Sequence, residues 1–396
     1  MPISHKIAEN LTRSSWIRKM FEEGERLRRE RGPEAVFDYS LGNPDHEPPP
    51  EFYAALRALA ADPPPGLHRY MSNAGYPETR AAVARRLASE TGLSVTAEHV
   101  VMTCGAGGAL NVILKTLLNP GEEVVVIAPY FVEYGFYIEN HGGRVVVAES
   151  SEDFQLDLDL LGRAIGPQTR AIIINSPNNP TGVLYPEASL RALDELLAAK
   201  EAEFGTTIYV ISDEPYAKLV YDGAKVPPVF NLLRHSIIAT SFSKDLALAG
   251  ERIGYAAVNP RIPDAAQIAA GLVFANRILG FVNAPALMQR LVAGLQEAEI
   301  DVASYRERRD ILYDHLVSLG FEVVKPAGTF YLFPKSPIPD DVAFAQMAAG
   351  RGLLFVPGSG FGRPGYFRLA YCIPKETILR SLPVFTALAR EVGLVR

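Results

Sequence analysis

Short runs of β-branched and other apolar residues alternate with longer amphipathic stretches between residues 100 and 260. Several of the short runs are apolar at every position, which is typical of strands buried on both faces of a sheet. Such an alternation of strands and helices predicts an α/β layer with a largely parallel sheet. The predicted strands are 100–103, 124–128, 144–148, 171–175, 207–212, 237–241 and 253–258.

The hydrophobic pattern changes on both sides of this region. Residues 1–13 are predicted to form a loose arm, and a helix is predicted to begin at Ser14 or Ser15 and to stop at Gly32-Pro33. From about residue 285, helices lead into short apolar runs, which predicts a smaller α+β domain. We expect three regions: an arm with part of the small domain, a large domain, and a small C-terminal domain, over residues 1–45, 46–285 and 286–396.

Composition and charge narrow the class of protein. The 396 residues are 48% hydrophobic, enough for more than one core, and the net charge of -6 argues against nucleic acid or an anionic membrane as a partner. Cys104 and Cys372 stand far apart and the seven histidines lack paired spacing, so neither a disulfide framework nor a metal site is expected. No signal peptide or apolar run of ~20 residues is visible, so a cytoplasmic protein is expected.

Residues with useful chemistry follow the predicted strands, where parallel sheets bind their ligands. The turn Gly105-Ala106-Gly107-Gly108 opens a helix, and bare amides at a helix N-terminus suit a phosphate. A dinucleotide-binding turn is the alternative, but Leu110 stands where that fingerprint requires its third glycine. Phe131, after the next strand, could stack on a planar cofactor or pack in the core.

Two further strand ends carry polar groups that suit an aromatic heterocycle. Asn179 lies in an elaborate loop, Asn178-Asn179-Pro180-Thr181-Gly182, and its amide can donate a hydrogen bond. Asp213 ends another strand, with Tyr216 three residues later. This pair could address a pyridine nitrogen and the adjacent ring oxygen, although Asp213 could instead cap a helix.

Lys244 follows the strand 237–241 and is flanked by Ser241 and Ser243, with Arg252 eight positions further on. Partial burial and a neighbouring cation would lower the pKa of this lysine and make it a Schiff-base nucleophile. Two serines and an arginine suit a phosphate dianion, so the set predicts pyridoxal phosphate (PLP). The alternative is a solvated lysine beside a capping serine.

Arg368 lies on an apolar strand near the C-terminus. A buried arginine requires an anionic partner, which would be either a structural carboxylate or the carboxylate of a substrate.

These motifs, in this order, resemble those of class I aminotransferases, the aspartate aminotransferase-like enzymes of PLP fold type I. The resemblance extends from about residue 35 to the C-terminus. It implies an α/β fold in which a large domain with a mostly parallel seven-stranded sheet is joined to a smaller α+β domain. It also rests on Tyr70 with Gly75-x-Pro77, upstream of the glycine turn.

The resemblance assigns roles at the cofactor ring. It implies that Lys244 forms the Schiff base and then serves as acid and base, and that Asp213 pairs with the pyridinium nitrogen. Asn179 and Tyr216 are expected to hydrogen-bond the ring oxygen, and Phe131 to stack on the ring.

The resemblance also indicates which residues contact the cofactor phosphate and the substrate. The phosphate is expected to lie against Ser241, Ser243, Arg252 and the amides of Gly105, Ala106 and Gly107. Tyr70 is expected to reach the phosphate of the neighbouring subunit, which implies a homodimer. Arg368 is expected to bind the substrate α-carboxylate together with Asn179 and the backbone of Gly42.

The implied function is PLP-dependent transfer of an amino group between an α-amino acid and a 2-oxo acid, with 2-oxoglutarate and glutamate as one pair. The alternatives are a β-eliminating lyase of the same fold and a non-catalytic PLP-fold binding module. Three departures from the family pattern stand out. The glycine turn contains no hydroxyl, Phe131 replaces a frequent tryptophan, and the second arginine of dicarboxylate-specific enzymes has no secure match. Arg277 of the partner, with Ile17 and Phe21, is expected to line the side-chain pocket.

Overall fold

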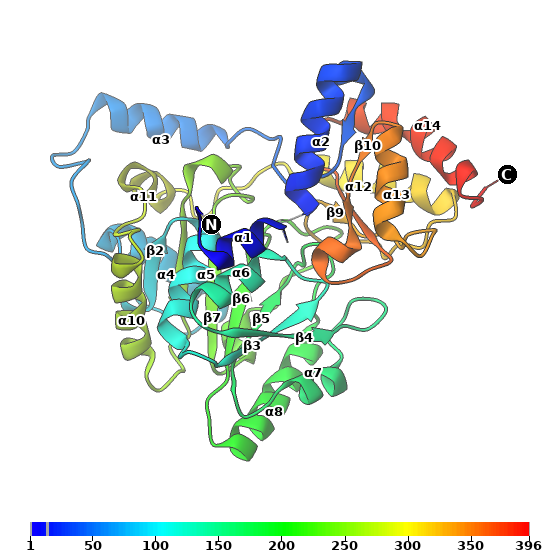
Figure 1. The fold of residues 1–396 in the computed structure, drawn as a ribbon. Helices are drawn as coiled ribbons and strands as arrows, with labels where there is room; N and C mark the ends of the chain where they lie inside the picture. The colour runs from blue at the N-terminus through cyan, green and yellow to red at the C-terminus, as the bar shows by residue number, and fades with distance from the viewer. Residues whose placement is uncertain (1, 13–15, 396) are drawn as a thin grey trace.

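The computed structural model describes residues 2–12 and 16–395, in which a large lobe carries a seven-stranded sheet and a smaller lobe lies beside it (Figure 1). The strand order is β2-β8-β7-β6-β5-β3-β4, and β8 runs antiparallel to both of its neighbours while the other pairs are parallel. All seven predicted strands are confirmed, with ends shifted by one or two residues at most. They are β2 (Val100–Thr103), β3 (Glu123–Ala128), β4 (Arg144–Glu149), β5 (Thr169–Asn175), β6 (Tyr209–Asp213), β7 (Ser236–Ser241) and β8 (Gly254–Val258).

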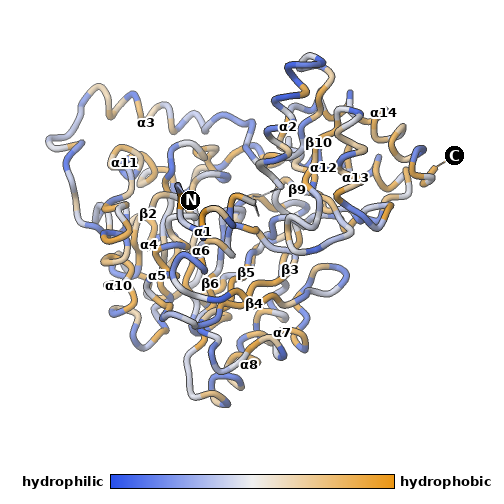
Figure 2. Tube along the Cα trace, in the orientation of Figure 1, coloured by the Kyte–Doolittle hydropathy of each residue, from blue (hydrophilic) through white to orange (hydrophobic). Residues whose placement is uncertain are grey.

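Helices cover both faces of this sheet, which explains why its strands are apolar at consecutive positions. On β3, Val125 and Ile127 join a core with α4 (Pro77–Thr91), α7 (Leu158–Ala164) and α8 (Glu187–Phe204). Val124 and Val126 point to the opposite face and pack with α5, α6 and α10. These three helices span Gly105–Leu117, Glu133–Asn140 and Ala265–Ile278. Figure 2 shows the strands β3 and β4 coloured largely as hydrophobic.

The small lobe is α+β, as predicted. A three-stranded antiparallel sheet has the order β11-β12-β9, and a second pair joins β1 to β10 in parallel. Its helices pack around a core rich in aromatic rings, including Tyr39, Phe330 and Phe367. Its elements are β1 (Phe37–Asp38), β9 (Tyr331–Leu332), β10 (Leu353–Leu354), β11 (Val356–Pro357), β12 (Phe367–Ala370), α2 (Trp16–Arg31), α12 (Val302–Ser318), α13 (Asp341–Gly350) and α14 (Lys375–Glu391).

The N-terminal region differs from its prediction. Residues His5–Thr12 form a helix, α1, so the loose arm predicted for 1–13 is wrong over this range. Ile7 and Leu11 lie one turn apart and are 50% and 60% exposed. The helix is only eight residues long, too short to show a clear helical spacing of apolar residues in the sequence. Lys6 Nζ donates to the backbone oxygen of Glu139 at 2.7 Å, which ties α1 to α6. The predicted caps Ser14 and Ser15 lie outside the described residues, and α2 ends just before Gly32 as predicted.

The region around residue 286 belongs by its contacts to the large lobe. Helix α11 (Ala286–Ala293) packs against α4 and α3 (Pro50–Ala61), and its Met288 and Leu291 join the core under the sheet. The predicted domain boundaries themselves stay a prediction.

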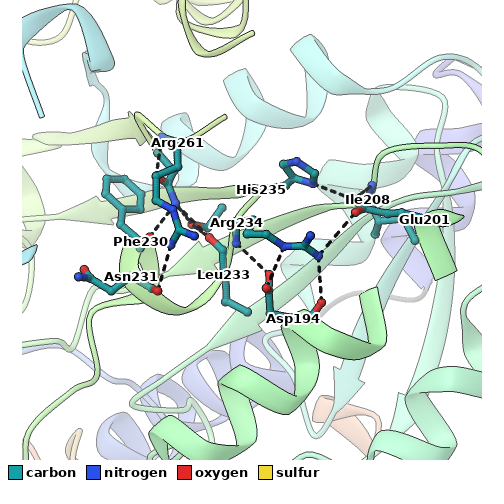
Figure 3. A network of polar contacts seen from close by, with 11 residues as sticks. Asp194, Glu201, Ile208, Phe230, Asn231, Leu233, Arg234, His235 and Arg261 are labelled. Atoms are coloured by element: carbon teal, nitrogen blue, oxygen red, sulfur yellow. Dashed lines mark hydrogen bonds and ion pairs between the residues drawn. The ribbon is translucent and has the colours of Figure 1, made fainter. Parts of the chain in front are cut away.

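A polar network fixes the amino ends of β6 and β7 (Figure 3). Asp194 on α8 accepts hydrogen bonds from the backbone N and the Nε of Arg234, both at 2.9 Å. Glu201, two turns later on α8, accepts from Ile208 N at 2.9 Å and contacts His235 Nδ1 at 2.7 Å. The network therefore sets the positions of the two strands whose carboxyl ends carry Asp213 and Ser241.

Candidate active site

A cavity of about 320 Å³ opens at the carboxyl ends of β5, β6 and β7, where ligand sites are expected in α/β sheets. The structure brings most of the predicted site residues together here. Of the residues predicted to bind the cofactor, Gly105 and Tyr70 are outside its lining. The predicted site residues that line it are Gly42, Ala106, Gly107, Phe131, Asn179, Asp213, Tyr216, Ser241, Ser243, Lys244, Arg252 and Arg368.

A larger cavity of about 620 Å³ lies behind this site, next to Arg86, Glu214 and Asp245. Of the predicted site residues it contacts only Ser241, so the chemistry expected from the sequence belongs to the smaller cavity.

Lys244 follows β7 and points into the smaller cavity. Its Nζ donates to the backbone oxygen of Gly42 at 2.6 Å. Burial, aided by the charges of Arg368 and Arg252 and opposed by Cys372, lowers the pKa of Lys244 to about 8. The alternative of an ordinary solvated lysine is therefore wrong, and a substantial fraction of this amine is neutral at slightly alkaline pH.

Asp213 ends β6 with one carboxylate oxygen engaged and the other free. Its Oδ2 accepts a hydrogen bond of 2.5 Å from Tyr134, and Asn175 Nδ2 holds its backbone oxygen at 2.7 Å. Its Oδ1 is buried and has no hydrogen-bond partner among the described residues. Burial raises the pKa of Asp213 to about 7 against the opposing hydrogen bond from Tyr134. A protonated pyridine nitrogen would supply the donor and positive charge that Oδ1 lacks.

Arg368 on β12 is 2% exposed and makes no ion pair with any described carboxylate. Its Nη1 donates to Asn179 Oδ1 at 3.0 Å and its Nη2 to the backbone oxygen of Ser40 at 2.5 Å, while its buried Nε has no partner. The ring of Tyr331 lies 4.5 Å from the guanidinium carbon. The alternative of a structural acid is thus not observed, and the guanidinium keeps donor capacity for an incoming carboxylate.

The part of the cavity around Tyr216 and Tyr331 is closely packed. Tyr216 and Tyr331 share a hydrogen bond of 3.0 Å between their hydroxyls. A Cβ at Gly42 would lie 1.8 Å from Tyr331 Oη, so only glycine fits there. The missing side chain of Gly42 therefore makes room for Tyr331, and the predicted contact of the Gly42 backbone with a substrate stays a prediction.

The opposite end of the cavity suits an anion. Gly105 has φ of +71°, and a Cβ there would lie 2.8 Å from Arg252 Nη2, so the glycine turn and the arginine are in close contact. Arg252 Nη1 donates to the backbone oxygen of Ala249 at 2.8 Å, and Ser241 Oγ accepts from Ser243 N at 3.4 Å. The amino end of α5, a guanidinium and two hydroxyls form a donor set for a phosphate.

The other predicted residues differ in their position relative to this cavity. Phe131 lines the cavity edge-on to Tyr134, with ring centroids 5.6 Å apart. Tyr70 is 89% exposed and Arg277 is exposed at the end of α10, so neither reaches this cavity within one chain. The side chains of Ile17 and Phe21 lie outside the described residues. Sequence reasoning missed four polar side chains that line the cavity, namely Tyr134, Tyr137, Asn175 and Tyr331.

The donor set, the orphaned Asp213 oxygen and the lysine of lowered pKa fit PLP, so the fold and site define a PLP-dependent enzyme of fold type I. The family "Aminotransferase class I and II" matches residues 34–382, and the chain belongs to this family as a class I aminotransferase. Its activity is therefore PLP-dependent transamination.

Named relatives agree over nearly the whole chain. The aspartate/prephenate aminotransferase of Thermus thermophilus is 37% identical over 89% of this chain and 90% of its own length. The aspartate aminotransferase of Geobacillus stearothermophilus is 32% identical over 87% and 88%. A solved amino transferase from Eubacterium rectale superposes with a TM-score of 0.96 at 38% identity, covering 99% of this chain and all of the other.

Two other features were sought in the described residues. They contain no group of three or more side chains that could hold a metal ion. None of the helices that they form is long and apolar enough to cross a membrane.

Proposed function

We propose that this aminotransferase exchanges the amino group of an α-amino acid with a 2-oxo acid, and that glutamate and 2-oxoglutarate form one of its couples. The observation that carries this proposal is that Lys244 and Arg368 line the same cavity, and that the buried Nε of Arg368 has no hydrogen-bond partner among the described residues. An enzyme that acts on an α-amino acid requires an amine that can move the Cα proton, as Lys244 could, and a group that binds the α-carboxylate, as the Arg368 guanidinium could. The named aspartate and prephenate aminotransferases, and a Thermus thermophilus structure determined with maleate, support acidic substrates.

In this proposal Lys244 attaches the cofactor through Nζ and later moves a proton at the substrate Cα. Its pKa of about 8 lets it alternate between base and acid near neutral pH. Bound PLP supplies an electron sink for the pair left when the Cα proton departs. Asp213 holds a proton at the pyridine nitrogen, and Tyr134 holds the Asp213 carboxylate in place.

The remaining residues would bind and orient the cofactor and the substrate. Asn179 and Tyr216 would donate to the ring oxygen of the cofactor, and Phe131 would stack on its ring. Ser241, Ser243, Arg252 and the amides of Gly105, Ala106 and Gly107 would hold its phosphate. Arg368 binds the substrate α-carboxylate, aided by Asn179 and the Gly42 backbone, and so directs the Cα proton towards Lys244.

We also propose a cytoplasmic homodimer in which Tyr70 reaches the neighbouring site. The Tyr70 loop lies against α10, because Asn276 Nδ2 donates to Asn73 O at 2.9 Å. On α10, Phe274 and Ile278 lie one turn apart and are 58% and 50% exposed. An exposed aromatic loop beside an exposed apolar helix face supports a second copy covering both, with Arg277 near the partner's substrate pocket.

The test is the near-UV/visible spectrum of the purified enzyme during a half-reaction with single amino acids and no keto acid. Wild type should change colour with its amino donors and recover it with 2-oxoglutarate. Lys244→Ala should lose turnover by several orders of magnitude, because Lys244 is the only amine among the described residues that line the cavity. Lys225→Ala, an exposed lysine outside the cavity, is the matched control and should behave as wild type.

Two results would contradict the proposal. Multiple turnovers by Lys244→Ala at wild-type rate would remove the lysine from the chemistry. Release of ammonia without any colour change would indicate elimination in place of transfer.

A further inference from the structure

Tyr137 on α6 projects onto the first turn of α5, where the glycine turn opens the helix. A Cβ built on Gly107 would lie 3.3 Å from Tyr137 Oη, so the hydroxyl occupies the space beside this bare backbone. Both residues line the cavity of about 320 Å³. A phenol from a different helix therefore stands where a side chain of the turn itself would otherwise point.

The position matters because the glycine turn has no side-chain donor of its own. Residues 105–108 are Gly-Ala-Gly-Gly, so this turn can offer a phosphate only its amides. A phosphate dianion has three strong acceptor oxygens and is best satisfied by several donors at once. Tyr137 can fill this gap at the same end of the cavity as Arg252, whose charge acts on the phenol.

The Tyr137 hydroxyl is available as a donor. It makes no hydrogen bond within the described part of the chain. Burial, aided by the carboxylates of Glu133 and Asp213 and opposed by Arg252, raises the pKa of Tyr137 to about 12. The phenol therefore keeps its proton at neutral pH and can donate to an anion.

The frame around this hydroxyl is rigid. Asn111 Nδ2 donates to the backbone oxygen of Gly107 at 2.8 Å, and its Oδ1 lies 3.1 Å from Nε2 of His141 at the end of α6. Tyr134, one turn before Tyr137 on α6, donates to Asp213. One face of α6 thus presents two hydroxyls to the cavity, the first at Asp213 and the second at the start of α5.

We propose that Tyr137 is a cofactor-binding residue whose hydroxyl donates a hydrogen bond to the PLP phosphate and replaces the hydroxyl missing from the glycine turn. The inference rests on the proposed function in placing the phosphate at the start of α5.

The experiment measures the affinity of the apoenzyme for PLP and for pyridoxal, which lacks the phosphate, by absorbance or fluorescence titration. Tyr137→Phe should weaken PLP binding by roughly tenfold or more, as expected for a hydrogen bond to a charged group, and leave pyridoxal binding unchanged. The ³¹P resonance of bound PLP should also shift. Tyr134→Phe is the matched control on the same helix, and it should affect both ligands equally because Asp213 faces the ring.

A second variant keeps the test decisive if Tyr137→Phe packs poorly. Adding Gly107→Ser to Tyr137→Phe returns a hydroxyl to the turn in the space that the phenol oxygen vacates, and should restore much of the PLP affinity. Equal losses for PLP and pyridoxal, or no loss for either, would overturn the inference alone. Failure of the wild-type apoenzyme to bind PLP would overturn the proposed function together with it.

Discussion

At the scale of single residues, two residues that line the cavity each carry a buried polar atom without a partner among the described residues. These atoms are Asp213 Oδ1 and Arg368 Nε. A buried polar atom left unpaired costs roughly 1–3 kcal/mol. Under the proposed function, bound cofactor and substrate would supply the missing groups, one a proton donor and the other a carboxylate.

Substitution of Arg368 tests the substrate end. Arg368→Lys keeps the charge but removes the planar fork and Nε, so KM for both the amino acid and the keto acid should rise about 10- to 100-fold. PLP loading, followed by the visible spectrum, should stay at the wild-type level because Asp213 and the phosphate site are untouched. An unchanged KM for both substrates would remove Arg368 from carboxylate binding.

At the scale of elements, helix α8 and the strands β6 and β7 act as one unit. The hydrogen bonds of Asp194 and Glu201 tie the middle and end of α8 to the amino ends of both strands (Figure 3). Because a strand is stiff along its length, this anchoring also sets where Asp213 and Lys244 stand at the other end. Residues far from the chemistry thus contribute to its geometry.

Glu201→Gln tests this anchor and its pH dependence. Burial alone would raise the pKa of Glu201, but hydrogen bonds from His235 and Ile208 N leave it below the ordinary value. The stabilisation from a lowered pKa is fully present above the ordinary carboxylate range and is lost as pH falls through the folded-state pKa. Urea unfolding should therefore show a loss of about 1–2 kcal/mol at pH 7 that shrinks only below about pH 5.

The control for this prediction lies on the same helix. Glu203 is 54% exposed and pairs with Lys200 at the surface, so Glu203→Gln should change the unfolding free energy by less than about 0.5 kcal/mol at any pH. Equal effects of the two substitutions would show that Glu201 acts only as a surface charge.

At the scale of the whole molecule, the cavity of one chain lacks two predicted contacts, those of Tyr70 and Arg277. Tyr70 stands 89% exposed beside the apolar face of α10, and no described cation other than Lys244, Arg252 and Arg368 lines the cavity. A distal carboxylate of an acidic substrate would therefore need a cation from outside this lining. The proposed homodimer would supply it, together with the phosphate contact from Tyr70.

Phe274→Glu tests the dimer. A charge in the centre of the proposed apolar contact should shift the protein towards monomer in sedimentation or light-scattering measurements, and weaken PLP binding because Tyr70 of the partner is withdrawn. Leu379→Glu, at a position 39% exposed on α14 of the small lobe, is the control and should leave the dimer intact. A Phe274→Glu protein that remains dimeric would place the interface elsewhere.

The amino-acid sequence by itself determined the sheet and the reactive groups. Continuous Val and Ile runs identify strands buried on both faces, because such strands tolerate no polar side. Lys244, Asp213 and Arg368 were found because each is a polar residue at the end of, or within, an apolar strand. A local pattern is sufficient for these features, since burial forces the rest of the strand to be apolar.

Only the tertiary structure decided which further side chains line the cavity. Tyr134 and Tyr137 lie on a helix, where an aromatic residue usually packs in the core, and their hydroxyls reach Asp213 and the side of Gly107 only because α6 lies next to the ends of α5 and β6. Tyr331 comes from the small lobe, almost 300 residues after Gly42, whose missing side chain makes room for it. The helix α1 likewise depends on a distant contact to α6. Contacts between residues far apart in the chain produce no periodic pattern in the sequence, because the pattern around each residue reflects only the helix or strand to which it belongs.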